Sequence, residues 1–167
     1  VYRAAYVDRS VVSPTVVMPD GGRRSITDSG PSGAAASSAP PVATPTPAAA
    51  GATTAASVGA FLHARSGDKG GDANLGLWVT HDDPARRDAR VAWLLGWVTP
   101  QRVRALVPEA ADLDIDVVAL PNLGGVNVVL HGLLGLGVAA SSRFDPQAKG
   151  LGEWVRSRVV DIPEELV

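Results

Sequence analysis

The chain has 167 residues, 46% of them hydrophobic, 5% aromatic and 19% charged, with a net charge of −2, which allows one ordinary domain and additional segments. Its basic side chains form no concentrated cluster, which argues against a nucleic-acid-binding protein, because phosphate binding needs a basic face. The chain has no cysteine, which excludes disulfides, thiol catalysis and cysteine-ligated metal centres. It also has no stretch that is long and apolar enough to span a bilayer, so we expect a cytoplasmic protein without a membrane segment.

The first thirty residues carry two short β-like runs around a turn. Thr15 to Met18 is followed by Pro19-Asp20-Gly21-Gly22, and Arg23 to Thr27 can return as the partner strand. An isolated hairpin is only marginally stable in water. Because the chain begins at Val1 and not at a methionine, we expect residues 1–30 to be the terminal hairpin of an N-terminal domain that is mostly missing here.

Residues 31–57 consist almost entirely of Ala, Pro, Ser, Thr and Gly and carry no charge. The prolines oppose helix formation, and almost nothing in the segment is large enough to bury. Such a segment cannot offset the conformational entropy that ordering would cost. We therefore expect a disordered, flexible linker over residues 31–57.

Residues 58–167 form the one complete domain that we expect. Val58 to Ala64 and Asn74 to Thr80 are predicted strands on either side of a glycine-rich polar loop, Arg65 to Ala73. Two helices are predicted to start at Asp83-Pro84 and at Thr99-Pro100, because a capping side chain followed by proline is typical of a first helical turn.

The second half of this domain continues to alternate between predicted strands and helices. Asp112 to Leu120 alternates acidic and apolar residues, which indicates a strand, whereas Val126 to Leu136 is apolar nearly all round, which predicts a buried or interfacial helix. Val138 to Phe144 is a further predicted strand, Leu151 to Arg158 a short helix, and Val159 to Ile162 a strand that closes the sheet. The pattern predicts an α+β fold with helices on one face of a sheet.

The densest polar cluster is the segment from Arg65 to Asn74. Its glycines allow close backbone approach, and Arg65 and Lys69 can neutralise a phosphate or a carboxylate. The residue order is that of neither a P-loop nor a dinucleotide-binding fingerprint. Ser66 and Lys69 match the S-x-x-K spacing of some serine enzymes, but the glycines argue for a loop, and that mechanism needs one helix. A ligand-binding loop and a solvated hairpin connection both remain open.

A second polar cluster, Pro121 to Asn127, lies where a predicted strand ends and the predicted apolar helix begins. Free backbone N–H groups at a helix start favour anions, and Asn122 and Asn127 can hydrogen-bond a ligand. Alternatively, Asn122 caps the helix and Asn127 satisfies backbone groups. We expect the two clusters to meet at one edge of the sheet, with Lys69 and Asn122 in a shared cleft.

No metal or cofactor site is expected. The histidines lie in three different predicted elements, without the spacing of metal ligands: His63, His81 and His131. The aspartates of the alternating strand are interpreted as a solvated face: Asp112, Asp114 and Asp116.

Three segments together resemble a known family. They are HARSGDKGGDANLG from His63, LPNLGGVNVVLHGLLGLGV from Leu120 and SSRFDPQAKGLGEWV from Ser141, and they resemble the C-terminal domain of acyclic-terpene-utilisation (AtuA-like) proteins. The resemblance covers about Val58 to Ile162. It implies a ferredoxin-like antiparallel sheet, a large N-terminal AtuA-like domain as partner, and a place in the breakdown of citronellol- and geraniol-type acyl-CoA compounds. The positions that match the family's motifs are Arg65, Ser66, Asp68, Lys69, Asn74, Asn122 and Asn127.

Three functions stay open at this point. The domain could supply these residues to a site for an acyl-CoA or carboxylate ligand. It could be an interaction module that holds homo-oligomers together through Val126 to Leu136. It could also be a small enzyme with Lys69 or Asp68 as the acid–base group, and no catalytic residue is assigned.

Overall fold

The computed structural model describes residues 5, 7–26 and 51–167, which fall into two separate compact units divided between Pro41 and Val42. The first unit contains the predicted hairpin, with β1 (Thr15–Val17) antiparallel to β2 (Arg23–Ser25) after a short 3₁₀ turn, η1 (Arg9–Val11). Residues 31–50 of the expected linker lie outside the described residues. The expectation that the linker runs to Ser57 is wrong at its end, because Thr53–Ser57 forms strand β3.

The second unit is built around a four-stranded antiparallel sheet, which confirms the α+β prediction. Its strands are β4 (Leu62–Lys69), β5 (Asp72–Val79), β7 (Gly125–Leu130) and β6 (Ile115–Leu120), in this spatial order. The helices are α1 (Pro84–Trp97), α2 (Pro100–Leu106) and α3 (Leu151–Arg156), and short 3₁₀ turns are η2 (Val58–Ala60), η3 (Pro108–Ala110), η4 (Pro121–Leu123) and η5 (Glu164–Leu166).

Both predicted helix starts are confirmed, and local chemistry explains them. The Asp83 carboxylate accepts a hydrogen bond from the Arg86 amide at 3.2 Å, and the Thr99 hydroxyl accepts one from the Arg102 amide at 3.1 Å. A proline follows each capping residue at the first helical position. These caps satisfy amides that the helix itself leaves without partners.

The last strand, β8 (Val159–Pro163), does not close the main sheet as predicted. It pairs with β3 in a separate two-stranded antiparallel sheet, with Thr53 opposite Pro163 and Ser57 opposite Val159. The predicted strand from Val138 to Phe144 is also wrong, because this segment consists of turns and irregular backbone. The sequence does not indicate this pairing, because the small residues at positions 53–57 have the same composition as the segment before them.

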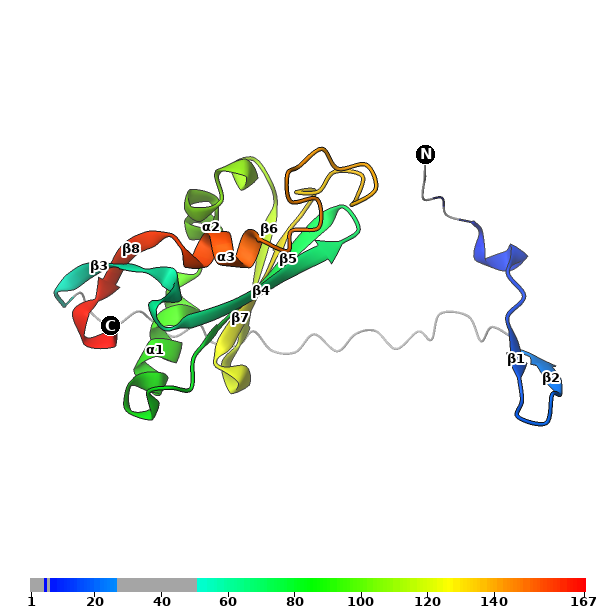
Figure 1. The fold of residues 1–167 in the computed structure, drawn as a ribbon, viewed down its shortest axis with the longest axis horizontal. Helices are drawn as coiled ribbons and strands as arrows, with labels where there is room; N and C mark the ends of the chain where they lie inside the picture. The colour runs from blue at the N-terminus through cyan, green and yellow to red at the C-terminus, as the bar shows by residue number, and fades with distance from the viewer. Residues whose placement is uncertain (1–4, 6, 27–50) are drawn as a thin grey trace. The chain divides into compact units, whose positions relative to one another are not determined.

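The core lies on one face of the four-stranded sheet, here called the inner face. Alternate residues of each strand point there and are buried, among them Leu62, Leu75, Leu77 and Val128. All three helices lie on the same side of the strands, as predicted (Figure 1). The opposite side, here called the outer face, has no helix from residues 51–167 of the second unit over it.

Candidate functional site

The outer face collects four of the residues that the sequence singled out. Side chains alternate along a strand, so residues two apart share a face. Arg65 and Lys69 of β4, Asn74 of β5 and Asn127 of β7 all have the parity opposite to the buried core residues. The strand register places Arg65, Gly76, Asn127 and Val118 in one row across the sheet.

One contact joins the two predicted clusters. The Asn74 Nδ2 group donates a hydrogen bond to Asn127 Oδ1 at 2.5 Å, and it lies 3.5 Å from the Val128 carbonyl oxygen. Asn74 and Asn127 are therefore neighbours on the outer face, on strands that are paired with each other.

The expected shared cleft between Lys69 and Asn122 is wrong. Lys69 pairs with Asp72 at the end of the sheet where Ala73 is opposite Leu130. Asn122 lies in η4, which leads into Gly125 at the opposite end, where Gly125 is paired with Trp78. The two residues thus lie at opposite ends of the strands.

The predicted helix from Val126 to Leu136 is also wrong. Gly125–Leu130 is strand β7, so no helix start presents amides to Asn122 or Asn127. Val126, Val128 and Leu130 are buried in the core and cannot form an interface between copies. An apolar run of this kind has no clear period, and its β-branched valines are the signal that favours a strand.

The glycine-rich segment is a tight hairpin and not a long loop. Strand β4 continues to Lys69, β5 begins at Asp72, and Gly70 turns between them with φ +65°. Strand alternation therefore places Asp68 and Lys69 on opposite faces. Ser66 points to the inner face and is buried: its hydroxyl accepts a hydrogen bond from the Gly152 amide at 2.8 Å, and its Oγ lies 3.4 Å from the Lys149 carbonyl oxygen. Ser66 thus anchors α3 to β4.

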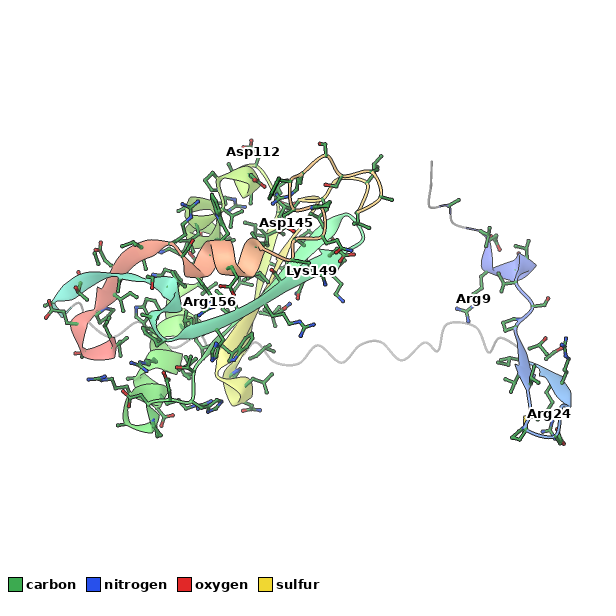
Figure 2. The ribbon with its side chains drawn as sticks, viewed as in Figure 1. Arg9, Arg24, Asp112, Asp145, Lys149 and Arg156 are labelled. Atoms are coloured by element: carbon green, nitrogen blue, oxygen red, sulfur yellow. The ribbon has the colours of Figure 1, made fainter. Side chains whose placement is uncertain are left out.

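A recess of about 420 Å³ lies at the free edge of β4. Its lining includes Arg65, Ser66, Trp78, Lys149 and Glu153. Lys149 lies beside β4 (Figure 2), and its Nζ is 3.6 Å from the position that a Cβ on Gly67 would take. Positive side chains from β4 and from the segment before α3 therefore gather near Gly67.

A second, mostly apolar groove of about 710 Å³ lies apart from all seven predicted residues. Val107, Leu151, Trp154 and the exposed Phe144 line it. No sequence pattern indicates this groove, because its residues come from distant parts of the chain.

Sequence reasoning missed a cluster of titratable side chains on the outer face. His131 follows β7, with Nδ1 3.2 Å from an Asp72 carboxylate oxygen and Nε2 2.9 Å from an Asp116 carboxylate oxygen. Asp72 also accepts a hydrogen bond from the Gly132 amide at 2.8 Å. Across residues 5, 7–26 and 51–167, no group of three or more acidic or imidazole side chains has an arrangement that could hold a metal ion.

The contacts within this cluster shift the pKa values of His131 and Asp72 toward their charged forms. The Asp116 carboxylate raises the pKa of His131 above its ordinary value, and Asp72 adds to this effect. The hydrogen bond from the Gly132 amide holds the pKa of Asp72 below its ordinary value. A neutral imidazole carries a single N–H, so His131 can donate to both carboxylates only when it is protonated.

We expect the His131 contacts to stabilise the fold more at acidic than at alkaline pH. Because folding raises the pKa of His131, this stabilisation is complete below the unfolded pKa of about 6.5 and is lost as the pH rises through the folded value. An NMR titration of the His131 ring should give a midpoint above 6.5, lowered in Asp116→Asn and unchanged in the control Asp88→Asn, at an exposed side chain on α1. A midpoint at or below 6.5 in the unmodified chain would contradict the double contact.

Comparison with known proteins gives one match. Residues 57–161 match the family described as the AtuA ferredoxin-like domain. No curated protein and no solved structure matches the chain. Within the described ranges, no helix is long and apolar enough to cross a membrane.

Proposed function

Because this chain belongs to the AtuA ferredoxin-like domain family, we propose that it is an accessory domain of an AtuA-like protein of acyclic terpene catabolism. It acts by docking the outer face of its sheet onto another protein surface. Its partner is either the N-terminal domain of an AtuA-like protein or a further copy of this chain.

The observation that carries this proposal is the composition of the outer face. An antiparallel sheet that faces water on one side normally alternates apolar residues inward with polar residues outward. On β6 the outward positions include Val118, which is 50% exposed, and Leu120, which is 36% exposed. Trp78 of β5 shares this face and is half-buried. Apolar side chains gathered on a sheet without a covering helix are typical of a protein interface.

Binding of a ligand is a second candidate function, favoured by the recess at the β4 edge. There Arg65 and Lys149 could pair with the carboxylate or phosphate of an acyl-CoA compound. Ser66, one of the seven residues expected to bind a ligand, is already hydrogen-bonded within the fold. The test is whether Lys149→Ala removes binding of an acyl-CoA to the chain.

A small acid–base enzyme finds less support. Asp68 and Lys69 are consecutive residues of β4, so they point to opposite faces of the sheet. An acid–base site could therefore use one of the two side chains and not both.

Docking can be tested by thiol labelling, because the chain has no cysteine and a single introduced thiol reports its own surroundings. We expect the thiol of Val118→Cys to become protected from a maleimide as the concentration of the full chain rises, or when the N-terminal domain of an AtuA-like protein is added. The control is Asp88→Cys on α1, at a side chain that is 101% exposed. Its reactivity should stay constant. Equal, unchanged reactivity at both positions in both mixtures would contradict docking.

A further inference from the structure

The outer face carries opposite charges at its two margins. The outward residues of β4 are His63, Arg65, Gly67 and Lys69, and those of the β6 margin are Leu120, Val118, Asp116 and the preceding Asp114. Arg65 and Lys69 are exposed, as are Asp114 and Asp116. One margin is thus basic and the opposite margin acidic.

We propose that the outer face pairs with the same face of a second copy of this chain, about a two-fold axis that runs parallel to the strands. This inference rests on the proposed docking function and names its partner. In a two-fold dimer, the same surface patch is used by both subunits, so the patch must be complementary to itself after rotation.

The charge pattern selects one orientation of that axis. An axis parallel to the strands lays β4 of one copy over β6 of the other, so that the basic margin meets the acidic margin. An in-plane axis perpendicular to the strands lays β4 over β4, so that the basic margins of the two copies meet each other. Like charges that face each other across an interface oppose association, whereas complementary charges favour it and fix its register.

The row register also brings large residues over small ones. The axis parallel to the strands keeps every row opposite the same row of the other copy. Asp116 then lies over Gly67, which has no side chain and separates Arg65 from Lys69 on the outer face. The Lys149 Nζ atom is also close to Gly67. Near the axis, Asn127 lies over Gly76, which has no side chain. Stacked sheets cross at about −30°, so this match is closest near the axis.

Other charged groups border the two margins without reversing the pattern. Arg104 lies near Asp114 and Asp116, and its guanidinium donates to the Leu113 carbonyl oxygen at 2.9 Å. In the row of Lys69, His131 is in contact with Asp72, and it also contacts Asp116 of the acidic margin. Asp114 has no hydrogen bond or ion pair through its side chain among the described residues, and it lies in that same row.

The size of the face sets the expected strength. With strands about 4.8 Å apart and a rise of about 3.4 Å per residue, the face measures roughly 19 Å by 24 Å in projection. An area of this size is below that of standard stable interfaces, of about 800 Å² per partner, so the dimer should be weak and dependent on concentration.

The test is the mass of the full 167-residue chain by sedimentation over a wide concentration range, with charge-reversed variants. We expect Lys69→Glu and Asp114→Lys each to raise the dimer dissociation constant about tenfold or more, because each turns attraction into repulsion at both symmetric contacts. The double variant should return to within about threefold of the original value, because the pair is restored with its signs exchanged. Asp88→Lys, the same charge change on α1, should have no effect.

Each result decides between orientations and partners. A monomer at all concentrations overturns the second-copy proposal, but the docking function stands if the thiol of Val118→Cys is still protected by the N-terminal domain. If Lys69→Glu lowers the dimer dissociation constant, the axis parallel to the strands is overturned, because this change relieves repulsion only in a dimer that lays β4 over β4. If neither single variant changes the dimer dissociation constant, the proposed pairing of Lys69 with Asp114 is overturned. Thermal melting of each variant verifies that these exposed substitutions leave the fold intact.

Discussion

Gly71→Ala is expected to destabilise the second unit by about 2–3 kcal/mol, because it forces an extra methyl group into a closely packed contact. A Cβ at this position would lie 2.3 Å from the Gly135 carbonyl oxygen, which belongs to the backbone and cannot rotate away. A backbone hydrogen bond fixes the two segments against each other, because the Leu134 amide donates to the Gly71 carbonyl oxygen at 2.8 Å. Thermal melting should show a midpoint lowered by about 10 °C.

Gly76→Ala is the matched control on the neighbouring part of β5. A Cβ there would meet only the Arg65 carbonyl oxygen at 3.7 Å, an ordinary van der Waals contact. This substitution should change the free energy of unfolding by no more than about 0.5 kcal/mol. The measurement is made at low protein concentration, where association of the chain does not contribute to stability. Similar losses for both variants would contradict the close approach of the 131–137 segment to the hairpin.

Leu75→Ala is expected to cost about 3–4 kcal/mol in the free energy of unfolding, within the range for buried leucines whose removal leaves a cavity. Leu75 is 1% exposed and lies on the inner face of β5, a central strand with neighbours on both sides. Strands paired on both sides have little freedom to collapse into the space left. Denaturant unfolding should show a lower midpoint with an unchanged slope.

Leu136→Ala makes the same chemical change where the side chain is 92% exposed. It should alter the unfolding free energy by less than about 0.5 kcal/mol. A small effect of Leu75→Ala, comparable with that of Leu136→Ala, would show that the sheet does not use β5 as its centre.

The parts of the fold that depend on local chemistry could be predicted from the sequence. The starts of α1 and α2 follow from a capping side chain and a proline in consecutive positions. The strand over β6 follows from alternation. For the residues of β7 the sequence pattern predicts a helix, because a run that is apolar on nearly all sides lacks a period. Only its pairing with both β5 and β6 makes it a strand.

The candidate site depends on register, which no local pattern carries. Asn74 and Asn127 were both singled out, yet their hydrogen bond depends on how β5 is aligned with β7. The same alignment separates Lys69 from Asn122. It also brings His131 between Asp72 and Asp116, residues that lie far from it in the sequence. Residue types therefore singled out polar side chains that lie on the outer face and did not indicate which of them meet there.

The small sheet of β3 and β8 determines how the domain would respond to mechanical load. Thr53, where the chain enters, is paired with Pro163, where it leaves, and the Glu164 amide also donates to the Ala52 carbonyl oxygen at 3.0 Å. Both attachment points thus lie at one end of an antiparallel ladder. A force that separates the two points would break the hydrogen bonds of the ladder one after another and would not load them all at once in shear. Beyond Pro163 the chain is anchored by η5, where Arg90 Nε donates to the Leu166 carbonyl oxygen at 2.8 Å. Tension on the two ends of the domain would therefore act on this anchor and on the β3–β8 ladder before it reaches the four-stranded sheet.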